Sequence, residues 1–279
     1  MSADNALLTL LNEKLNNNLL VLPTLPEIAV KVRQAADDPS INLAAMADVI
    51  AKDPALAARM VKVANSAFLG RSIKVANLTQ AVTRIGLSQV KNIATAMALE
   101  QLFVSHNEAV VDAMKELWLD TMEVTCIAMA CLKFYLVKHK HCNLNTDTMA
   151  LAALVHRIGV LPILSEAERH PSVFAEPHYL QHAIKDFAAE IGLSIVKSWQ
   201  FAELFHPVVS DWLNADLHEQ IGYVDFIRLG LIARGKFPGI EQQAELLDYY
   251  QQQGVIPEVD FMQHPDIAQA YQDARTMFV

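Results

Sequence analysis

Hydrophobic residues recur at helical spacing along most of the chain. No segment shows the alternation of apolar and polar residues, bounded by Asn-Gly or Asp-Gly turns, that predicts a β-hairpin. Between residues 26 and 36, Ile28, Val32 and Ala35 share one face of a helix, and Pro39 follows its end. We therefore expect an all-α protein.

Capping residues indicate where the next helices begin. Asn42 precedes one apolar-rich stretch. Asp53 precedes another, with Pro54 at its first position, where the missing N–H of proline has no cost. The pair Asn65-Ser66 predicts the end of this second helix. Its buried stripe is Leu56, Met60 and Val63.

Two further helices are expected to meet at Gly86, which stands where a left-handed helix end is needed. Thr79 can cap the first of them and Ser88 the second. Two helices joined at a glycine are also typical of a DNA-reading helix-turn-helix, but an ordinary helical corner is favoured because the second helix has a core-like face. That face consists of Val90, Ile93, Ala94 and Met97.

Beyond a polar segment at residues 105–107, which we interpret as a hinge between two lobes, three long helical patterns follow. They cover residues 108–140, 146–169 and 181–201. Thr146 or Asp147 can cap the second pattern, and Pro162 interrupts it. The Gln-rich, acidic tail after about residue 239 predicts partly ordered helices.

Composition places the chain among folded proteins. Of its 279 residues, 53% are hydrophobic, enough for one large domain or two small ones. Lys133 and the pair His156-Arg157 interrupt the longest apolar runs, so we expect no membrane span. The N-terminus lacks the features of a signal peptide, and the three cysteines form no CxxC pair. We expect a cytoplasmic protein.

The net charge of −9 argues against nucleic-acid binding, because a duplex-binding surface must contact several phosphates. Between residues 54 and 99, however, there is no Asp or Glu. The six basic residues of this segment are Arg59, Lys62, Arg71, Lys74, Arg84 and Lys91. Either they pair with acidic neighbours from other segments, or they form a docking face for an acidic partner or a nucleotide phosphate.

The usual nucleotide, hydrolase and calcium signatures are absent: GxGxxG, GxxxxGK[ST], GxSxG, HExxH and the EF-hand loop. His139, His141 and Cys142 could offer soft ligands, but their spacing fits no common zinc pattern. Cys126 and Cys131 lie in an apolar stretch, so we expect buried, unreactive thiols. The residues predict no metal site and no cofactor.

From about residue 19 to residue 235 the chain resembles the HDOD domain, a bacterial signalling output domain related to HD-type phosphohydrolases. The resemblance rests on the ordered motifs Leu-Pro, Leu-Pro, Asp-Pro-Ala-Leu, Asn-Ser and Gln-Ala-Val…Arg-Ile-Gly-Leu. The signature residues are Pro23, Pro26, Asp53, Pro54, Asn65, Ser66 and Gly86. The resemblance implies two all-helical lobes, at about 19–105 and 108–235, with helical extensions at 1–18 and 236–279.

HD enzymes hold divalent metals with one His, an adjacent His-Asp pair and a later Asp, and the metals activate water for attack on a phosphate. By the resemblance, Asp120 stands where the first His would be, and His156 keeps the His of the pair. Arg157 replaces its Asp, and a guanidinium has no lone pair to offer a metal. Asp211 stands where relatives often have His-His, and residues 187–192 lack another His that they often carry.

We hypothesise that Arg157 supplies the positive charge that a metal would bring and pairs with Asp120 or Asp211, because a buried Arg needs a partner. The alternative places Arg157 on the exposed side of a helix. His156 can equally be a core histidine whose hydrogen bonds are satisfied within the fold.

The resemblance implies a non-catalytic regulatory module. No sensor or receiver domain is recognisable beside it, so we expect it to meet signalling proteins in trans, with the groove between the lobes as a contact surface. The alternative is a degenerate phosphohydrolase, or a pseudoenzyme that binds a phosphorylated small molecule such as a cyclic dinucleotide, because Arg suits phosphate. Whether the acidic tail folds back on the basic segment as an autoinhibitory contact stays open.

Overall fold

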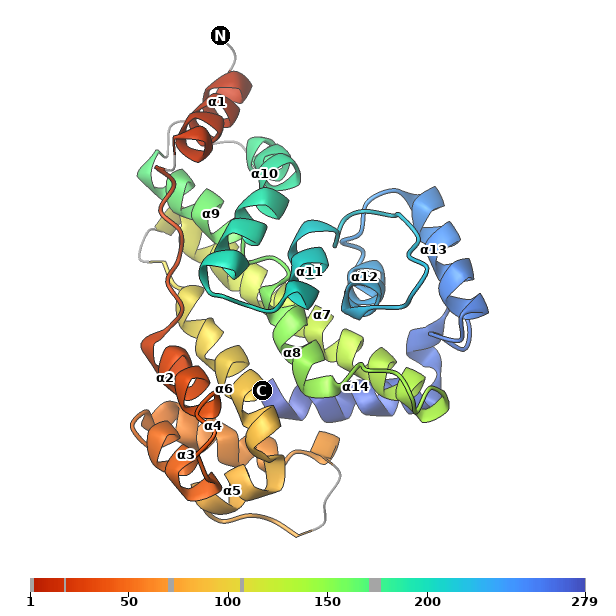
Figure 1. Ribbon diagram of the computed structural model, residues 1–279. Coiled ribbons are helices and arrows are strands. Elements are labelled where there is room, and N and C mark those ends of the chain that lie inside the picture. Colours follow the sequence, from red (N-terminus) through yellow and green to blue (C-terminus); the bar gives the residue numbers. More distant parts are fainter. Residues whose placement is uncertain (1–2, 18, 70–72, 106–107, 171–176, 279) are drawn as a thin grey trace.

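The computed structural model describes residues 3–17, 19–69, 73–105, 108–170 and 177–278. These residues form helices and no strand, which confirms the all-α prediction (Figure 1). The helices are α1 (Ala3–Asn16), α2 (Glu27–Ala36), α3 (Leu43–Ile50), α4 (Pro54–Ala64), η1 (Ala67–Leu69), α5 (Leu78–Ile85), α6 (Leu87–Ala98), η2 (Leu99–Leu102), α7 (Glu108–Lys138), α8 (Thr146–Val155), α9 (Val160–Arg169), α10 (Pro177–Ser198), η3 (Glu203–Phe205), α11 (His206–Ser210), α12 (Tyr223–Ala233), α13 (Ile240–Gln252), η4 (Phe261–Gln263) and α14 (Pro265–Phe278).

Helices α2 to α6 form the N-terminal lobe, and the predicted caps at its centre are confirmed. The side chain of Asn42 accepts a hydrogen bond from the Ala45 N–H at the start of α3, 2.9 Å away. Asp53 accepts one from the Leu56 N–H at 3.0 Å, and Pro54 is the first residue of α4. Each cap satisfies a backbone donor that the helix itself leaves free.

The corner between α5 and α6 differs in detail from the expectation. Asn77, rather than Thr79, caps α5, and α6 begins at Leu87, immediately after Gly86. Gly86 has a φ of +89°, a conformation that side chains with a Cβ disfavour. The positive φ of Gly86 confirms the prediction for this glycine, whereas the predicted caps Thr79 and Ser88 each lie two residues after the observed N-cap positions, Asn77 and Gly86.

Asn65 forms two hydrogen bonds to the loop that follows α4. Its amide donates to the Val75 carbonyl at 2.9 Å and accepts from the Val75 N–H at 2.8 Å. Arg84 donates to the carbonyl of Ala64 at 3.1 Å and to that of Ile73. These bonds hold the end of α4 and the entry to α5 together, so Asn65 is a structural residue of the lobe.

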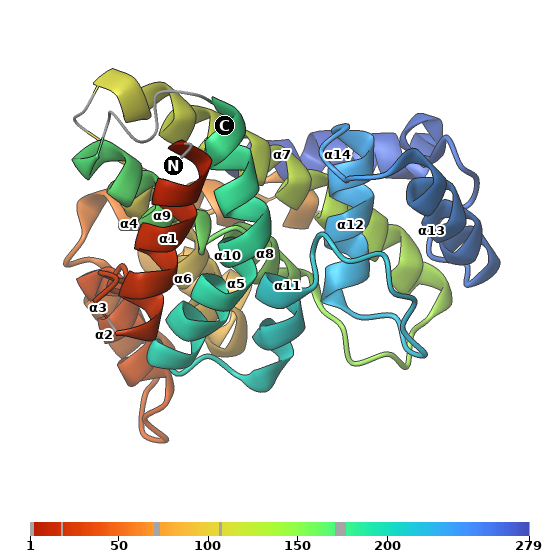
Figure 2. The same cartoon turned by 90° about the horizontal axis from the view of Figure 1, so that it is seen from above.

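The 31-residue helix α7 is the axis of the second lobe. Helices α8, α12 and α14 pack along it, while α9 and α11 pack against α10. The two lobes meet where α6 lies against α8. Figure 2 shows α12 and α13 at the opposite end of the molecule from α1, α2 and α3.

The apolar run from residue 146 to 169 is broken into two helices, and the break lies at residues 156–159 rather than at Pro162. Gly159 explains this position. A Cβ built there would lie 2.0 Å from the carbonyl oxygen of Ala188 and 2.6 Å from the nitrogen of Gly192, so the turn lies against the backbone of α10. Asn145, rather than Thr146 or Asp147, caps α8.

Among the described residues, only the stretch Thr146–Arg169 is long and apolar enough to span a membrane by composition. The most apolar window of this stretch is 89% buried within the fold, as in the core helices of globular proteins. It is therefore weak evidence for a span. The cytoplasmic location stays a prediction.

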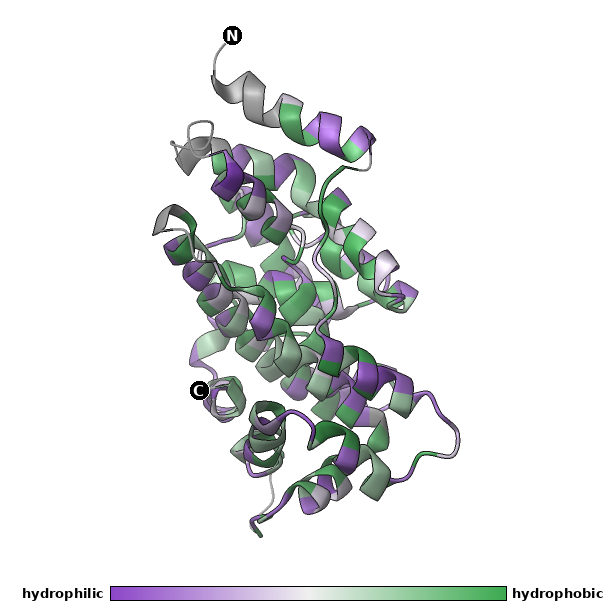
Figure 3. Ribbon diagram, turned by 90° about the vertical axis from the view of Figure 1, so that its left-hand side faces the viewer, coloured by the Kyte–Doolittle hydropathy of each residue, from purple (hydrophilic) through white to green (hydrophobic). Residues whose placement is uncertain are grey.

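Both terminal extensions are helical. Lys14 of α1 forms an ion pair with the buried Glu166 of α9, and α1 packs against α10. The tail is more ordered than expected, because α14 packs along α7 and also contacts α4 and η1. Its buried residues, Ile267, Ala270, Ala274 and Met277, follow the helical repeat. In Figure 3, hydrophobic and hydrophilic residues alternate along most helices, as amphipathic packing requires.

Candidate functional site

His156 is the first residue of the turn between α8 and α9 and is only 1% exposed. Its Nδ1 lies 2.5 Å from the Ala153 carbonyl oxygen, so Nδ1 carries the proton in this contact. Its Nε2 is buried without a hydrogen-bond partner, and the ring lies edge-on to Trp212 at 5.4 Å. Burial and the neighbouring charge of Arg157 lower the pKa of His156 to about 3. The imidazole is therefore neutral at physiological pH.

Arg157 lies on the same tryptophan. Its guanidinium carbon is 5.7 Å from the centroid of the Trp212 ring, and its Nε and Nη1 are buried without a hydrogen-bond partner. Burial lowers the pKa of Arg157, and the charges of Asp120 and Glu116 oppose this effect. The arginine is therefore neither on an exposed helix face nor in an ion pair with a described residue, and the expectation of a direct pair with Asp120 or Asp211 is wrong.

Asp120 is held by two other cations. Its carboxylate lies 3.1 Å from Nη2 of Arg234 and 3.1 Å from Nζ of Lys236, both in the segment that follows α12. Burial raises the pKa of Asp120, but the hydrogen bonds from Lys236 and Arg234 and the charge of Arg157 outweigh it, so the pKa lies below its ordinary value. The carboxylate is ionised, and two cations contact it directly.

Asp211 takes part through its backbone. Its carbonyl accepts hydrogen bonds from Nη2 and Nε of Arg228, at 3.1 and 3.3 Å. Arg228 is fully buried and also contacts the carboxylate of Asp225 at 3.3 Å, which in turn accepts a hydrogen bond from the Tyr250 hydroxyl at 2.9 Å. This network connects α12 and α13 to the segment that carries Trp212.

This set of donors does not fit a divalent metal. Arg157 brings a fixed positive charge and no lone pair, and the free nitrogen of His156 is enclosed beside an indole. Asp120 already has two cationic partners. In the part of the chain that the structure describes, no three His, Cys, Asp or Glu side chains are grouped so that they could hold a metal ion.

Three of the basic residues of the N-terminal lobe have partners within the fold. Arg59 pairs with Glu100 and Lys91 pairs with Asp37, while Arg84 bonds to the backbone. Lys74 is exposed, and Arg71 lies outside the described residues. The pairs with acidic neighbours favour the first of the two sequence interpretations.

The tail reaches this basic segment through apolar residues. Met277 and Phe278 of α14 line a small hollow together with Arg59 and Lys62. The tail therefore does fold back on the basic segment. It is part of the packed fold, because Met277 is buried there.

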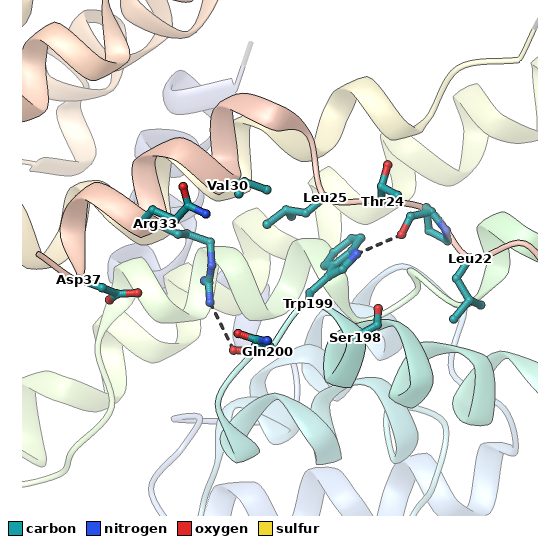
Figure 4. A pocket seen from close by; sticks show the side chains of 11 residues that line it. Leu22, Thr24, Leu25, Val30, Arg33, Asp37, Ser198, Trp199 and Gln200 are labelled. Atoms are coloured by element: carbon teal, nitrogen blue, oxygen red, sulfur yellow. Dashed lines mark hydrogen bonds between the residues drawn. The ribbon is translucent and has the colours of Figure 1, made fainter.

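A groove of about 590 Å³ lies between the two lobes. Its walls are the extended segment 22–25, one face of α2, and the residues Ser198, Trp199 and Gln200 at the end of α10 (Figure 4). The indole of Trp199 donates to the Pro23 carbonyl at 3.0 Å, which fixes the extended segment against α10. Arg33 crosses the groove from α2 toward the Gln200 carbonyl at 3.5 Å.

Sequence reasoning missed several residues of these sites. Trp212, Arg234 and Lys236 come from segments far from residues 156–157, and their approach depends on how α11 and α12 pack. The pair Asp225 and Arg228 did carry a signal, because two opposite charges three residues apart stand in an otherwise apolar helix. The expectation for Cys126 and Cys131 is confirmed, since both are buried and burial raises the pKa of each thiol.

The HDOD domain model matches residues 22–211, inside the predicted range of 19–235. The chain therefore belongs to the HDOD domain family. A crystal structure of a candidate metal-dependent phosphohydrolase from Shewanella amazonensis SB2B is similar over the full length of both chains, with 38% identity and a TM-score of 0.94. A candidate signal transduction protein from Marinobacter aquaeolei VT8 is 20% identical with a TM-score of 0.61, over 99% of this chain and 66% of that one.

A protein of unassigned function from Treponema pallidum (strain Nichols) is 24% identical over 208 residues. The match spans 68% of this chain but only 36% of the length of that relative. The similarity therefore covers one region of a larger protein.

Proposed function

We propose that this HDOD protein is a non-catalytic signal-transduction module that works by binding other proteins. The observation that carries the proposal is Arg157, which stands beside His156 where HD enzymes have a metal-binding Asp. A fixed cation there repels a divalent metal and offers it no lone pair. The groove between the lobes provides a contact surface for a partner.

A second candidate function is a pseudoenzyme that binds a phosphorylated small molecule at the degenerate site. It is favoured by one observation: Nε and Nη1 of Arg157 are buried donors without an acceptor. Arginine recognises phosphate through paired N–H donors. The related alternative is a degenerate HD-type phosphohydrolase. The similarity to the Shewanella amazonensis protein, described as a candidate metal-dependent phosphohydrolase, supports this alternative.

Metal content tests the proposal. The purified protein is incubated with Mn²⁺, desalted and analysed for bound metal, with His156→Ala as the matched variant. We expect much less than one metal ion per chain in both proteins. One ion per wild-type chain that is lost in His156→Ala would contradict the proposal and favour a metal-dependent site.

A further inference from the structure

The groove between the lobes is large enough for a specific ligand and combines apolar walls with a few polar groups. Its volume of about 590 Å³ falls within the usual range for ligand sites. Leu22, Leu25 and Val30 supply apolar surface beside Trp199. Figure 4 shows these side chains around Trp199, with Arg33 and Asp37 toward one end.

One wall is an extended backbone with free hydrogen-bonding groups. Residues 21–26 belong to no helix, and prolines at positions 23 and 26 favour an extended conformation. The Pro23 carbonyl is bonded to Trp199. Within the described chain, the backbone N–H and C=O groups of Leu22, Thr24 and Leu25 have no hydrogen-bond partner. Such a segment is a template for a second extended strand.

Two opposite charges, Arg33 and Asp37, line the groove, and the charge of Asp37 acts on Arg33. Lys91, outside the lining, pairs with Asp37, so these three side chains together carry one more positive than negative charge. Arg33 stacks on the ring of Phe201 at 4.4 Å and makes only a long contact of 3.5 Å with the Gln200 carbonyl. Its guanidinium therefore keeps donors for an acidic group.

We propose that this groove binds an extended, acidic peptide segment of a partner protein. The peptide backbone pairs with residues 22–25, its apolar side chains contact Leu25 and Trp199, and one carboxylate binds Arg33. The proposal rests on the proposed function, because it names the kind of partner that the signalling module recognises.

A peptide fits these observations better than a phosphorylated small molecule. Phosphate sites bring several donors to one point, often two cationic side chains or a helix N-terminus. The groove is lined by one guanidinium, by apolar side chains, and by Leu22, Thr24 and Leu25, whose backbone groups have no hydrogen-bond partner within the described chain. That pattern matches strand addition, in which main-chain hydrogen bonds give affinity and side-chain contacts give specificity.

The test uses a fluorescein-labelled ten-residue peptide that alternates Glu and Leu, with binding followed by fluorescence polarisation. We expect Arg33→Gln to weaken binding by about tenfold, the effect of losing one charge-assisted contact. Arg59→Gln removes the same charge from a residue outside the groove and should leave the affinity unchanged. A peptide with methylated amide nitrogens at alternate positions should bind at least about tenfold more weakly, because it cannot pair with the backbone.

The three tryptophans locate the bound peptide. In a ¹⁵N–¹H spectrum, the indole signal of Trp199 should shift on titration, while those of Trp118 and Trp212 stay in place. The proposal is overturned if no binding occurs at millimolar peptide, if the methylated peptide binds equally well, or if Arg33→Gln has no effect. A shift of Trp199 by a cyclic dinucleotide, with none by the peptide, would also overturn it.

The peptide result is separable from the proposed function. If the peptide binds as described and the protein also hydrolyses phosphodiesters with Mn²⁺, the inference stands and the non-catalytic assignment fails. If neither peptide binding nor hydrolysis is found, the inference fails and the non-catalytic assignment stands.

Discussion

Arg157 stacks over the indole of Trp212, with its guanidinium carbon 5.7 Å from the ring centroid. By the resemblance to HD enzymes, Arg157 stands at a position where those enzymes have a metal ligand. His156 shares the same ring at 5.4 Å. Both side chains pack on Trp212, so the turn after α8 contacts the segment after α11 through this ring.

Replacing Arg157 by an apolar side chain of similar length should be tolerated. Arg157→Met removes two buried donors that lack acceptors, and it loses a cation–π contact worth about 1 kcal/mol. We expect the free energy of unfolding to change by less than about 1 kcal/mol. Trp212→Ala, by contrast, should cost about 3 kcal/mol or more, because it leaves a cavity beside both residues. Urea denaturation measures both, and a loss of several kcal/mol in Arg157→Met would show that the arginine has an acceptor.

Burial of His156 predicts a loss of stability in mild acid. Its pKa is about 3 in the folded protein against an ordinary value of 6.5, so the unfolded chain binds the proton more tightly. The free energy of unfolding is then highest above about pH 6.5 and falls as the pH decreases from 6.5 toward 3. At about 1.4 kcal/mol for each pKa unit, the expected loss at pH 5 is about 2 kcal/mol.

The matched variant is His156→Gln, which cannot take up a proton in this range. Its stability should fall less between pH 7 and pH 5 than that of the wild type, in urea titrations at each pH. Asp120 does not interfere, because its lowered pKa affects stability only below about pH 4. Equal losses in the two proteins would count against a buried, neutral His156.

Arg228 should be among the most sensitive positions for stability. Arg228→Ala leaves the carboxylate of Asp225 buried without its cation and removes the donor to the Asp211 carbonyl. Breaking a buried pair in this way costs about 3–5 kcal/mol. Arg234→Ala removes a cation from the half-exposed pair with Asp120 and should cost about 1 kcal/mol or less. Similar losses in the two variants would show that the Asp225 network is not the stronger one.

Gln200 occupies a position that favours glycine. Its φ is +54°, and the N–H groups of Gln200 and Phe201 bond to the carbonyls of Lys197 and Val196, the arrangement of a helix end with a left-handed residue. We expect Gln200→Gly to raise the free energy of unfolding by about 1 kcal/mol. Gln200→Ala keeps the Cβ and should bring no such gain, so a gain in both variants would contradict the explanation.

Local sequence signals predict many of the helices and several of their ends. The caps at Asn42 and Asp53, the glycine at position 86 and the helical stripes all depend on neighbouring residues, so they were visible in the chain itself. The position of the break near residue 156 could not be predicted from neighbouring residues, because it depends on the close approach of Gly159 to α10. The order of the C-terminal tail also depends on a tertiary contact, because α14 packs along α7. The tail sequence alone therefore predicts less helical order than the structure has.

The candidate site was predicted only in part. The family resemblance located Asp120, His156 and Arg157, and the structure links them electrostatically. The partners of Asp120 could not be predicted, because Arg234 and Lys236 approach it from more than a hundred residues away. The motif contains Arg157, but it does not show which cation contacts the carboxylate of Asp120. The packing of the segment after α12 decides this, because it brings Arg234 and Lys236 to the oxygen atoms.

Hydrolysis of bis-p-nitrophenyl phosphate and of cyclic dinucleotides by the purified protein, with added Mn²⁺, distinguishes a non-catalytic module from an enzyme. If the protein is non-catalytic, the wild type and His156→Ala give the same rate, and this rate does not rise with protein concentration. Turnover by the wild type that disappears in His156→Ala would identify the chain as an HD-type enzyme with an unusual site.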